Sequence, residues 1–136
     1  MDLQNASFRD MDLSAFDFHG SNLAGSCFAN ASLRFCDFSD CDLSSVDFTG
    51  ADLRGAVFRN TVLAGANLTN ADLSPAEILD ENGHKTGRVW QTLIMNCTLD
   101  KVIKTGANLT DIKYVSQAVK LASAVLLVLG TTHMFM

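Results

Sequence analysis

Four cysteines, three histidines and a long series of aspartates are the residues of this sequence that could do chemistry. Cys97, His84 and Asp100 have the types that a nucleophile, a general base and an orienting carboxylate would need. Nothing in their spacing brings a nucleophile and a base within about 3 Å of one another, so the sequence predicts no enzyme. The cysteines lack Cys-x-x-Cys spacing, and neither a metal site nor a cofactor is expected.

The aspartates recur at multiples of five residues, each directly before a large apolar residue. The series consists of Asp12, Asp17, Asp37, Asp42, Asp47, Asp52 and Asp72. One interpretation is that these carboxylates serve solubility and local turn hydrogen bonds. The other is an acidic rod that resembles a DNA duplex and enters a basic DNA-binding groove of a partner protein. Four arginines interrupt the acidic surface and favour the first interpretation: Arg9, Arg34, Arg54 and Arg59.

A candidate interaction surface follows from this series. Phe35 occupies a position that elsewhere holds Gly, Asn or Asp, so its ring is expected to project from a corner of the fold. One exposed aromatic side chain on a rod could anchor a partner. The predicted surface consists of Asp12, Asp37, Asp42, Asp47, Asp52 and Phe35.

The element that must position these side chains is a five-residue repeat. A large apolar residue, here called a centre, occupies every fifth position up to residue 78. The centres are Leu3, Phe8, Leu13, Phe18, Leu23, Phe28, Leu33, Phe38, Leu43, Phe48, Leu53, Phe58, Leu63, Leu68, Leu73 and Ile78. A small residue stands two positions before most centres, and both should face inward, as alternate residues of an extended segment do.

A period of five fits neither a helix nor a flat strand, so the chain must turn after every few extended residues. Gly or Asn often stands two positions after the centre, where a turn demands tolerance of positive φ. At the beginning of the repeat, three bulky residues replace the small ones and are expected to plug the first coil: Met1, Met11 and Phe16.

These features resemble the pentapeptide-repeat family. Ala51-Asp52-Leu53-Arg54-Gly55 and Ala71-Asp72-Leu73-Ser74-Pro75 are similar to its Ala-Asp/Asn-Leu-x-x consensus. The resemblance implies an all-β solenoid, a right-handed quadrilateral parallel β-helix with four repeats per coil. Phe8, Phe28 and Phe48 would then stack on one face and Phe18, Phe38 and Phe58 on the opposite face, with Leu68 and Ile78 continuing the two stacks.

Three segments are predicted along the chain. Residues 1–80 form the repeat β-helix, residues 81–115 a loop plus an irregular coil, and residues 116–136 an apolar C-terminal segment. The loop spans residues 81–87. Beyond it, a weaker register runs through Val89, Ile94, Leu99, Leu109 and Tyr114, but Lys104 falls at a centre. A distorted coil or two and a non-repeat cap both remain open for this stretch.

Residues 116–129 are compatible with a helix, with Ser116 as N-cap and Gly130 as its end. Because residues 121–129 are apolar nearly all round, an isolated surface helix is not expected. A cap on the open coil end, a homodimer contact and a membrane tail anchor remain open. An anchor is the least favoured, because the uncharged run is shorter than the roughly 20 residues that a membrane span needs.

The net charge of −5 divides unevenly, with −8 in residues 1–80 and +3 in residues 81–136. This acidic balance argues against direct binding of nucleic acid. A start without a basic n-region followed by an apolar run, together with four cysteines interpreted as reduced, predicts a cytoplasmic protein.

Three functions are considered from the sequence. The first is a non-catalytic scaffold that mediates protein–protein interaction with a partner whose identity the sequence does not give. The second comes from the resemblance, because quinolone-resistance members of the family bind DNA gyrase as duplex mimics, although the rod here is short. The third is a small enzyme, which would need a pocket that a packed tube does not offer.

Overall fold

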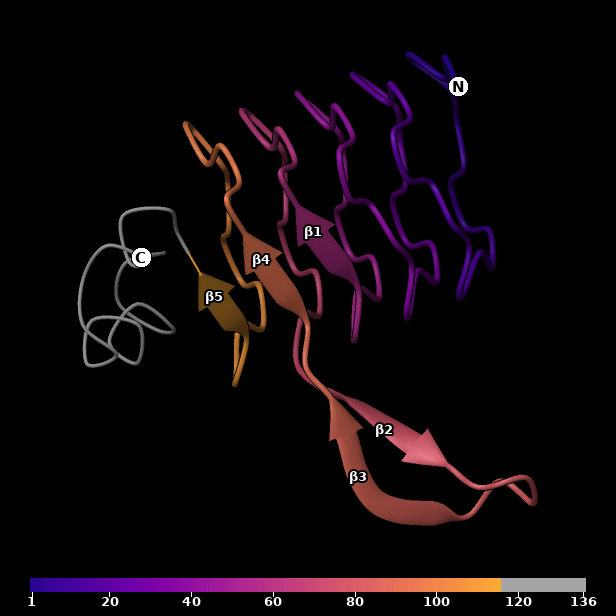
Figure 1. The fold of residues 1–136 in the computed structure, drawn as a ribbon. Coiled ribbons are helices and arrows are strands. Elements are labelled where there is room, and N and C mark those ends of the chain that lie inside the picture. Colours follow the sequence, from indigo (N-terminus) through magenta and orange to yellow (C-terminus); the bar gives the residue numbers. More distant parts are fainter. Residues whose placement is uncertain (116–136) are drawn as a thin grey trace.

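The computed structural model describes residues 1–115, and they form a parallel β-helix (Figure 1). Successive coils are joined by parallel bridges between residues twenty positions apart, such as Asp2 with Asn22 and Asp17 with Asp37. Four such bridging positions occur in each coil, so the solenoid has four sides. The expected four repeats per coil are therefore confirmed. The helix predicted for residues 116–129, and the roles considered for residues 116–136, lie outside the described residues.

The corners of the solenoid are β-turns that close on the centre residue. The backbone N–H of Ser21, for example, donates to the carbonyl of Phe18 at 2.9 Å. The residue two positions after the centre has positive φ, 74° at Gly20 and 58° at Asn30. Even Phe35 adopts this conformation, with φ of 62°. The predicted positive φ at every fifth position is thus confirmed. Residues with no special preference for this conformation, such as Ala15 and Phe35, also adopt it.

The core consists of four columns of centre residues, one residue per coil in each column. Rings in the Phe18–Phe38–Phe58 column stack with centroids 5.1 Å and 5.3 Å apart. The facing column contains Phe28 and Phe48, and the two columns meet edge to face, as Phe28 does with Phe38 at 5.8 Å and 82°. Edge-to-face and offset-stacked pairs are the geometries that aromatic rings prefer.

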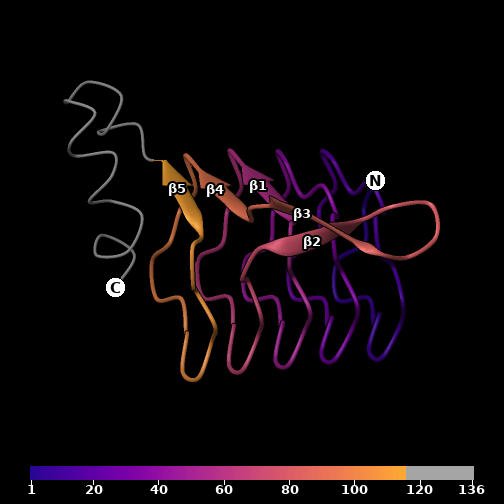
Figure 2. The same cartoon turned by 90° about the horizontal axis from the view of Figure 1, so that it is seen from below.

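A β-hairpin interrupts the solenoid after Pro75. Its strands are β2 (Ala76–Leu79) and β3 (Lys85–Trp90), which pair antiparallel. Pro75 falls at the corner position where other coils have positive φ, but the proline ring fixes φ near −65°. The turn therefore cannot form there, and the chain leaves the coil. In Figures 1 and 2 the hairpin extends from the side of the stack back toward the N-terminal coils.

The solenoid resumes at Thr92 and continues to the end of the described residues. Strands β1 (Val57–Arg59), β4 (Leu93–Met95) and β5 (Lys113–Val115) form a parallel three-stranded sheet along one side. Val57 pairs with Leu93 rather than with the residue twenty positions later, so residues 76–91 are an insertion. The resumed part bridges to the preceding coil at Leu93, Thr98, Ile103 and Asn108, so it is a further coil, with Lys104 at one centre position.

Two sequence predictions are corrected by the hairpin. Ile78 is not a core centre but lies on β2, and Ile94 takes the place after Phe58 in its column. Val89 is likewise no centre, since it lies on β3 and is 54% exposed. The predicted loop 81–87 forms the tip of the hairpin and the beginning of β3.

The first coil is not plugged by its bulky residues. The Phe16 ring lies 4.5 Å from that of Phe18, but Phe16 is itself 44% exposed, Met11 46% and Met1 70%. The prediction that these three bulky residues plug this end is therefore wrong, because all three are exposed. Within residues 1–115 no helix has the length and apolar character needed to cross a membrane.

Candidate interaction surface

Each side of the solenoid presents one column of outward-facing residues, and we name the four sides by a member. The Asp42 face comprises Asp2, Asn22, Asp42, Val62 and Thr98. The Asp47 face comprises Ser7, Cys27, Asp47, Asn67 and Ile103. The Asp52 face comprises Asp12, Ser32, Asp52, Asp72 and Asn108. The Lys113 face comprises Asp17, Asp37, Val57, Leu93 and Lys113.

The aspartates of the predicted surface are divided among all four faces. Asp12 and Asp52 share one face, whereas Asp37, Asp42 and Asp47 each lie on a different one. A ten-residue step along the chain crosses to the opposite side, so a regular sequence spacing distributes the charges around the rod. No face carries an unbroken acidic column in the described part of the chain.

The carboxylates also accept local hydrogen bonds from the backbone. The Oδ1 atom of Asp37 accepts the backbone N–H of Ser39 at 2.8 Å, and Asp47 accepts that of Thr49 at 2.9 Å. Asn67 forms the same bond with Thr69 at 3.0 Å, so the charge is not required. These bonds are Asx turns that hold each corner, which is the structural interpretation of the aspartate series.

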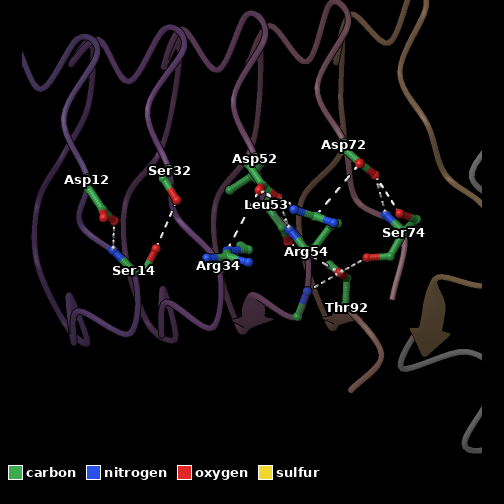
Figure 3. Close-up of polar contacts among 11 residues, drawn as sticks. Asp12, Ser14, Ser32, Arg34, Asp52, Leu53, Arg54, Asp72, Ser74 and Thr92 are labelled. Carbon is green, nitrogen blue, oxygen red and sulfur yellow. Dashed lines mark hydrogen bonds and ion pairs between the residues drawn. The ribbon is translucent and has the colours of Figure 1, made fainter. Parts of the chain in front are cut away.

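Two arginines neutralise the Asp52 face (Figure 3). The Arg54 guanidinium donates to Asp52 through Nε at 2.9 Å and Nη2 at 2.8 Å, and its Nε lies 3.8 Å from Asp72 Oδ2. Arg34 Nε lies 3.8 Å from Asp52 Oδ2. Charges of opposite sign therefore alternate along this face, which makes it a poor imitation of a phosphate backbone.

Exposed apolar side chains lie along the hairpin and on the solenoid wall beside it. Leu79, Val89 and Trp90 are each more than half exposed, and Phe35 is 39% exposed. A groove of about 460 Å³ separates hairpin and solenoid there. It is lined by Arg34, Phe35, Glu77, Ile78, Leu79 and Trp90. The structure thus places Phe35, but none of the five predicted aspartates, in the wall of this groove.

The hairpin residues were missed by the sequence reasoning, although one signal was available. Pro75, the single proline of the chain, stands where the repeat needs positive φ. The segment Ala71–Pro75 matches the repeat consensus at its first three positions, and this match concealed the fact that its last position cannot complete a turn.

The comparisons with known proteins agree with this geometry. A family model described as pentapeptide repeats matches residues 2–40 and 36–74, with eight copies. The chain belongs to the pentapeptide repeat family. The matched region ends one residue before Pro75, and no curated protein matches the sequence.

Solved structures of pentapeptide repeat proteins are similar to this chain to different degrees. One from the Arabidopsis thaliana thylakoid lumen is 32% identical with a TM-score of 0.69, covering 82% of this chain and 66% of its own. The chain thus spans about two thirds of that protein's length. Rfr23 from the cyanobacterium Cyanothece 51142 is 20% identical, with a TM-score of 0.43, and the match covers 85% and 88% of the two chains. QnrB1, a plasmid-mediated fluoroquinolone resistance protein, is 20% identical with a TM-score of 0.43, covering 79% and 57%. The plant protein and the family match imply a right-handed β-helix solenoid.

At the insertion, the Thr92 side chain replaces one backbone hydrogen bond between successive coils (Figure 3). In the preceding coil the N–H of Phe35 donates to the carbonyl of Arg54, but the equivalent N–H of Gly55 donates to Thr92 Oγ1 at 2.8 Å. The Thr92 hydroxyl lies 3.2 Å from the Leu53 carbonyl and 3.4 Å from that of Ser74. This buried hydroxyl therefore occupies the gap that the departing chain leaves in the backbone ladder.

Thr92→Val should lower the free energy of unfolding by about 1–3 kcal/mol, because the Gly55 N–H would remain buried without an acceptor. Urea unfolding followed by circular dichroism measures the change. Thr61→Val is the matched control, since the equally buried Thr61 hydroxyl donates to the Phe38 carbonyl but accepts no backbone N–H. Equal losses for the two variants would contradict a special role of Thr92.

The ion pairs of Asp52 with Arg54 and Arg34 should make the free energy of unfolding depend on pH in the acid range. Burial raises the pKa of Asp52, but the hydrogen bonds and charges of Arg54, with the charge of Arg34, outweigh it and hold that pKa below 3.8. A lowered carboxyl pKa stabilises the fold above the unfolded value and loses this effect as pH falls through the folded value.

Asp52→Asn should therefore reduce stability near neutral pH by about 1 kcal/mol or less, and the difference from the parent should vanish as pH falls below 3.8. Urea midpoints over a pH series measure it. Asp47→Asn, which removes no ion pair recorded among the described residues, is the control. A difference that persists at low pH would show that the Asp52 charge is not responsible.

The residues considered for chemistry are used elsewhere in the structure. His84 lies at the hairpin tip, with Nδ1 3.7 Å from Asp80 Oδ2, whereas the Cys97 thiol donates to the Phe58 carbonyl at 3.1 Å. Burial raises the pKa of Cys36 and of Cys41 to about 11, which leaves these thiols poorly nucleophilic. No cluster of His, Cys, Asp and Glu suited to a metal ion occurs among residues 1–115.

Proposed function

We propose that this protein is a non-catalytic pentapeptide-repeat scaffold that binds another protein through its hairpin and the adjoining solenoid wall. The observation that supports the proposal is the exposure of Leu79, Val89 and Trp90 on one inserted element, next to Phe35. Aromatic and arginine residues are enriched at the centres of protein interfaces. This groove offers two aromatic rings and Arg34 together.

The architecture suits such a role. Apolar centres continue after the insertion at Ile94, Leu99, Leu109 and Tyr114, so the solenoid extends on both sides of the hairpin as a packed base. The hairpin lies outside these columns. Binding residues on inserted segments that a packed scaffold positions are a common solution in proteins.

The alternative of a DNA mimic that binds DNA gyrase has less support. A mimic needs phosphate-like charge along one continuous side, whereas the aspartates are distributed over four faces and two arginines neutralise the Asp52 face. A supercoiling assay tests this alternative directly. Inhibition of gyrase by the purified chain would restore it.

The scaffold proposal is tested with a surface variant, Leu79→Ser with Val89→Ser and Trp90→Ser, used with the parent as bait in cross-linking capture. A captured protein is identified, purified and titrated against both baits. We expect the variant to lose at least about 2 kcal/mol of affinity, as removal of an interface centre does. The matched control is Val62→Ser with Ile103→Ser, which removes exposed apolar side chains from two other faces. Equal binding by variant and parent would contradict the proposal.

A further inference from the structure

A second groove lies on the other side of Trp90, between the hairpin and the Lys113 face. Its volume is about 290 Å³. The lining includes Val57, Arg59, Val89, Trp90, Leu93 and Lys113. We call it the cationic groove. Val57 and Leu93 are outward-facing neighbours in the sheet formed by β1, β4 and β5, so they supply an apolar floor beside two cationic side chains.

The charges in this groove are unbalanced. Arg59 and Lys113 have no ion-pair partner within residues 1–115, and no carboxylate is among the lining residues. Arg54 is matched with Asp52 at 2.8 Å and Lys85 with Glu77 at 3.2 Å, whereas Arg88, Lys101 and Lys104 also have no ion pair among residues 1–115 but do not line this groove. Two unmatched cations beside an exposed tryptophan stand out on a chain whose net charge is −5.

The combination selects for one kind of occupant. Carboxylates would be drawn to Arg59 and Lys113, and an apolar side chain would cover Trp90, which is 52% exposed. A segment with cations would be repelled. Residues 116–136 of this chain fit poorly on charge, because Lys120 is their one residue of the Asp, Glu, Lys or Arg types.

We propose that the cationic groove binds an extended acidic segment of a partner protein, with carboxylates on Arg59 and Lys113 and an apolar side chain against Trp90. This inference rests on the proposed scaffold function and adds the chemistry of the partner. An extended segment fits because β3 pairs only with β2 within the described residues, which leaves a β-strand edge at the hairpin for backbone hydrogen bonds.

Trp90 allows a direct test, because it is the single tryptophan of the chain. The full chain is titrated with a capped ten-residue peptide in which Glu alternates with Val, and with a matched peptide in which Lys replaces every Glu. We expect a saturable shift of Trp90 emission with the Glu peptide at concentrations up to about 1 mM, and none with the Lys peptide. Binding should weaken several-fold as salt rises from about 0.05 to 0.5 M.

The decisive variant is Arg59→Glu with Lys113→Glu, which should weaken binding of the Glu peptide by at least tenfold and restore some binding of the Lys peptide. Arg9→Glu with Lys101→Glu changes the net charge equally at distant exposed sites and should bind the Glu peptide as the parent does. Circular dichroism confirms that each variant is folded.

Several outcomes would overturn the inference. These are no saturable response to the Glu peptide, equal response to both peptides, or unchanged binding by the Arg59→Glu, Lys113→Glu variant. A Trp90 emission that changes on dilution but not with peptide would assign the groove to a second copy of the chain. If the Leu79, Val89 and Trp90 variant loses an identified partner while the charge reversal does not, the scaffold function stands and this inference fails.

Discussion

Phe38→Ala is expected to lower the free energy of unfolding by about 3–5 kcal/mol. The Phe38 side chain is fully buried and stacks between Phe18 and Phe58 at 5.1 Å and 5.3 Å. It also meets Phe28 and Phe48 edge to face, both at 5.8 Å. Removing it opens a cavity in the middle of two columns, where the backbone ladders on either side prevent collapse. Urea unfolding followed by circular dichroism measures the loss.

Phe35→Gly is the matched control, because it removes the same side chain from a corner. Phe35 has φ of 62° and is 39% exposed, with its ring over Gly55. Glycine adopts positive φ without strain, so the gain in backbone energy offsets the lost contact and stability should change by about 1 kcal/mol or less. A loss comparable to that of Phe38→Ala would mean that stability does not reside in the columns.

Removing residues 76–91 together with Pro75→Gly should leave the solenoid folded and abolish partner binding. The deletion joins position 75 directly to Thr92, which restores the spacing of the preceding coils. Glycine supplies the positive φ that the corner needs, and the shorter connection reduces the entropy cost of closure. We expect the unfolding free energy to stay within about 1 kcal/mol of the parent value.

The same deletion with Pro75 retained is the control for this variant. Proline cannot adopt positive φ, so the corner would remain strained and this form should be less stable by about 1–3 kcal/mol than the glycine form. Thermal and urea unfolding of the two forms provide the comparison. Complete unfolding of the glycine form would show that the hairpin belongs to the core rather than to an inserted binding element.

The sequence predicted the repeat solenoid over residues 1–80, and the pattern holds as far as residue 75 because each corner depends on a few neighbouring residues. A centre such as Leu53, a small residue two positions earlier and a corner residue such as Gly55 together specify one side of the coil. These relations are local and recur, so a pattern of period five reveals them without knowledge of distant contacts. The alternation of Phe and Leu centres then gave the correct columns.

The candidate site was predicted less well, since it depends on contacts between distant segments. The Arg34–Asp52 and Arg54–Asp72 ion pairs join successive coils, so they follow from the coil length rather than from neighbouring residues. The predicted interaction surface therefore included carboxylates that the structure scatters over four sides. Of the predicted surface, Phe35 lines the groove beside the hairpin, where Glu77, Ile78, Leu79 and Trp90 come from the unpredicted hairpin.

The sequence by itself determined the repeat, its corners and the composition of the core, because turn conformation and inward alternation are properties of five consecutive residues. Only the tertiary structure decided that Ile94, not Ile78, follows Phe58 in its column, and that Trp90 lies beside Arg59 and Lys113. The physical reason is that the chain leaves the coil at Pro75 and returns at Thr92, where a buried hydroxyl replaces a lost backbone bond. The insertion ends where the backbone ladder can be completed again. This point depends on the Gly55 N–H and the Ser74 carbonyl, which belong to separate coils and both lie next to the Thr92 hydroxyl.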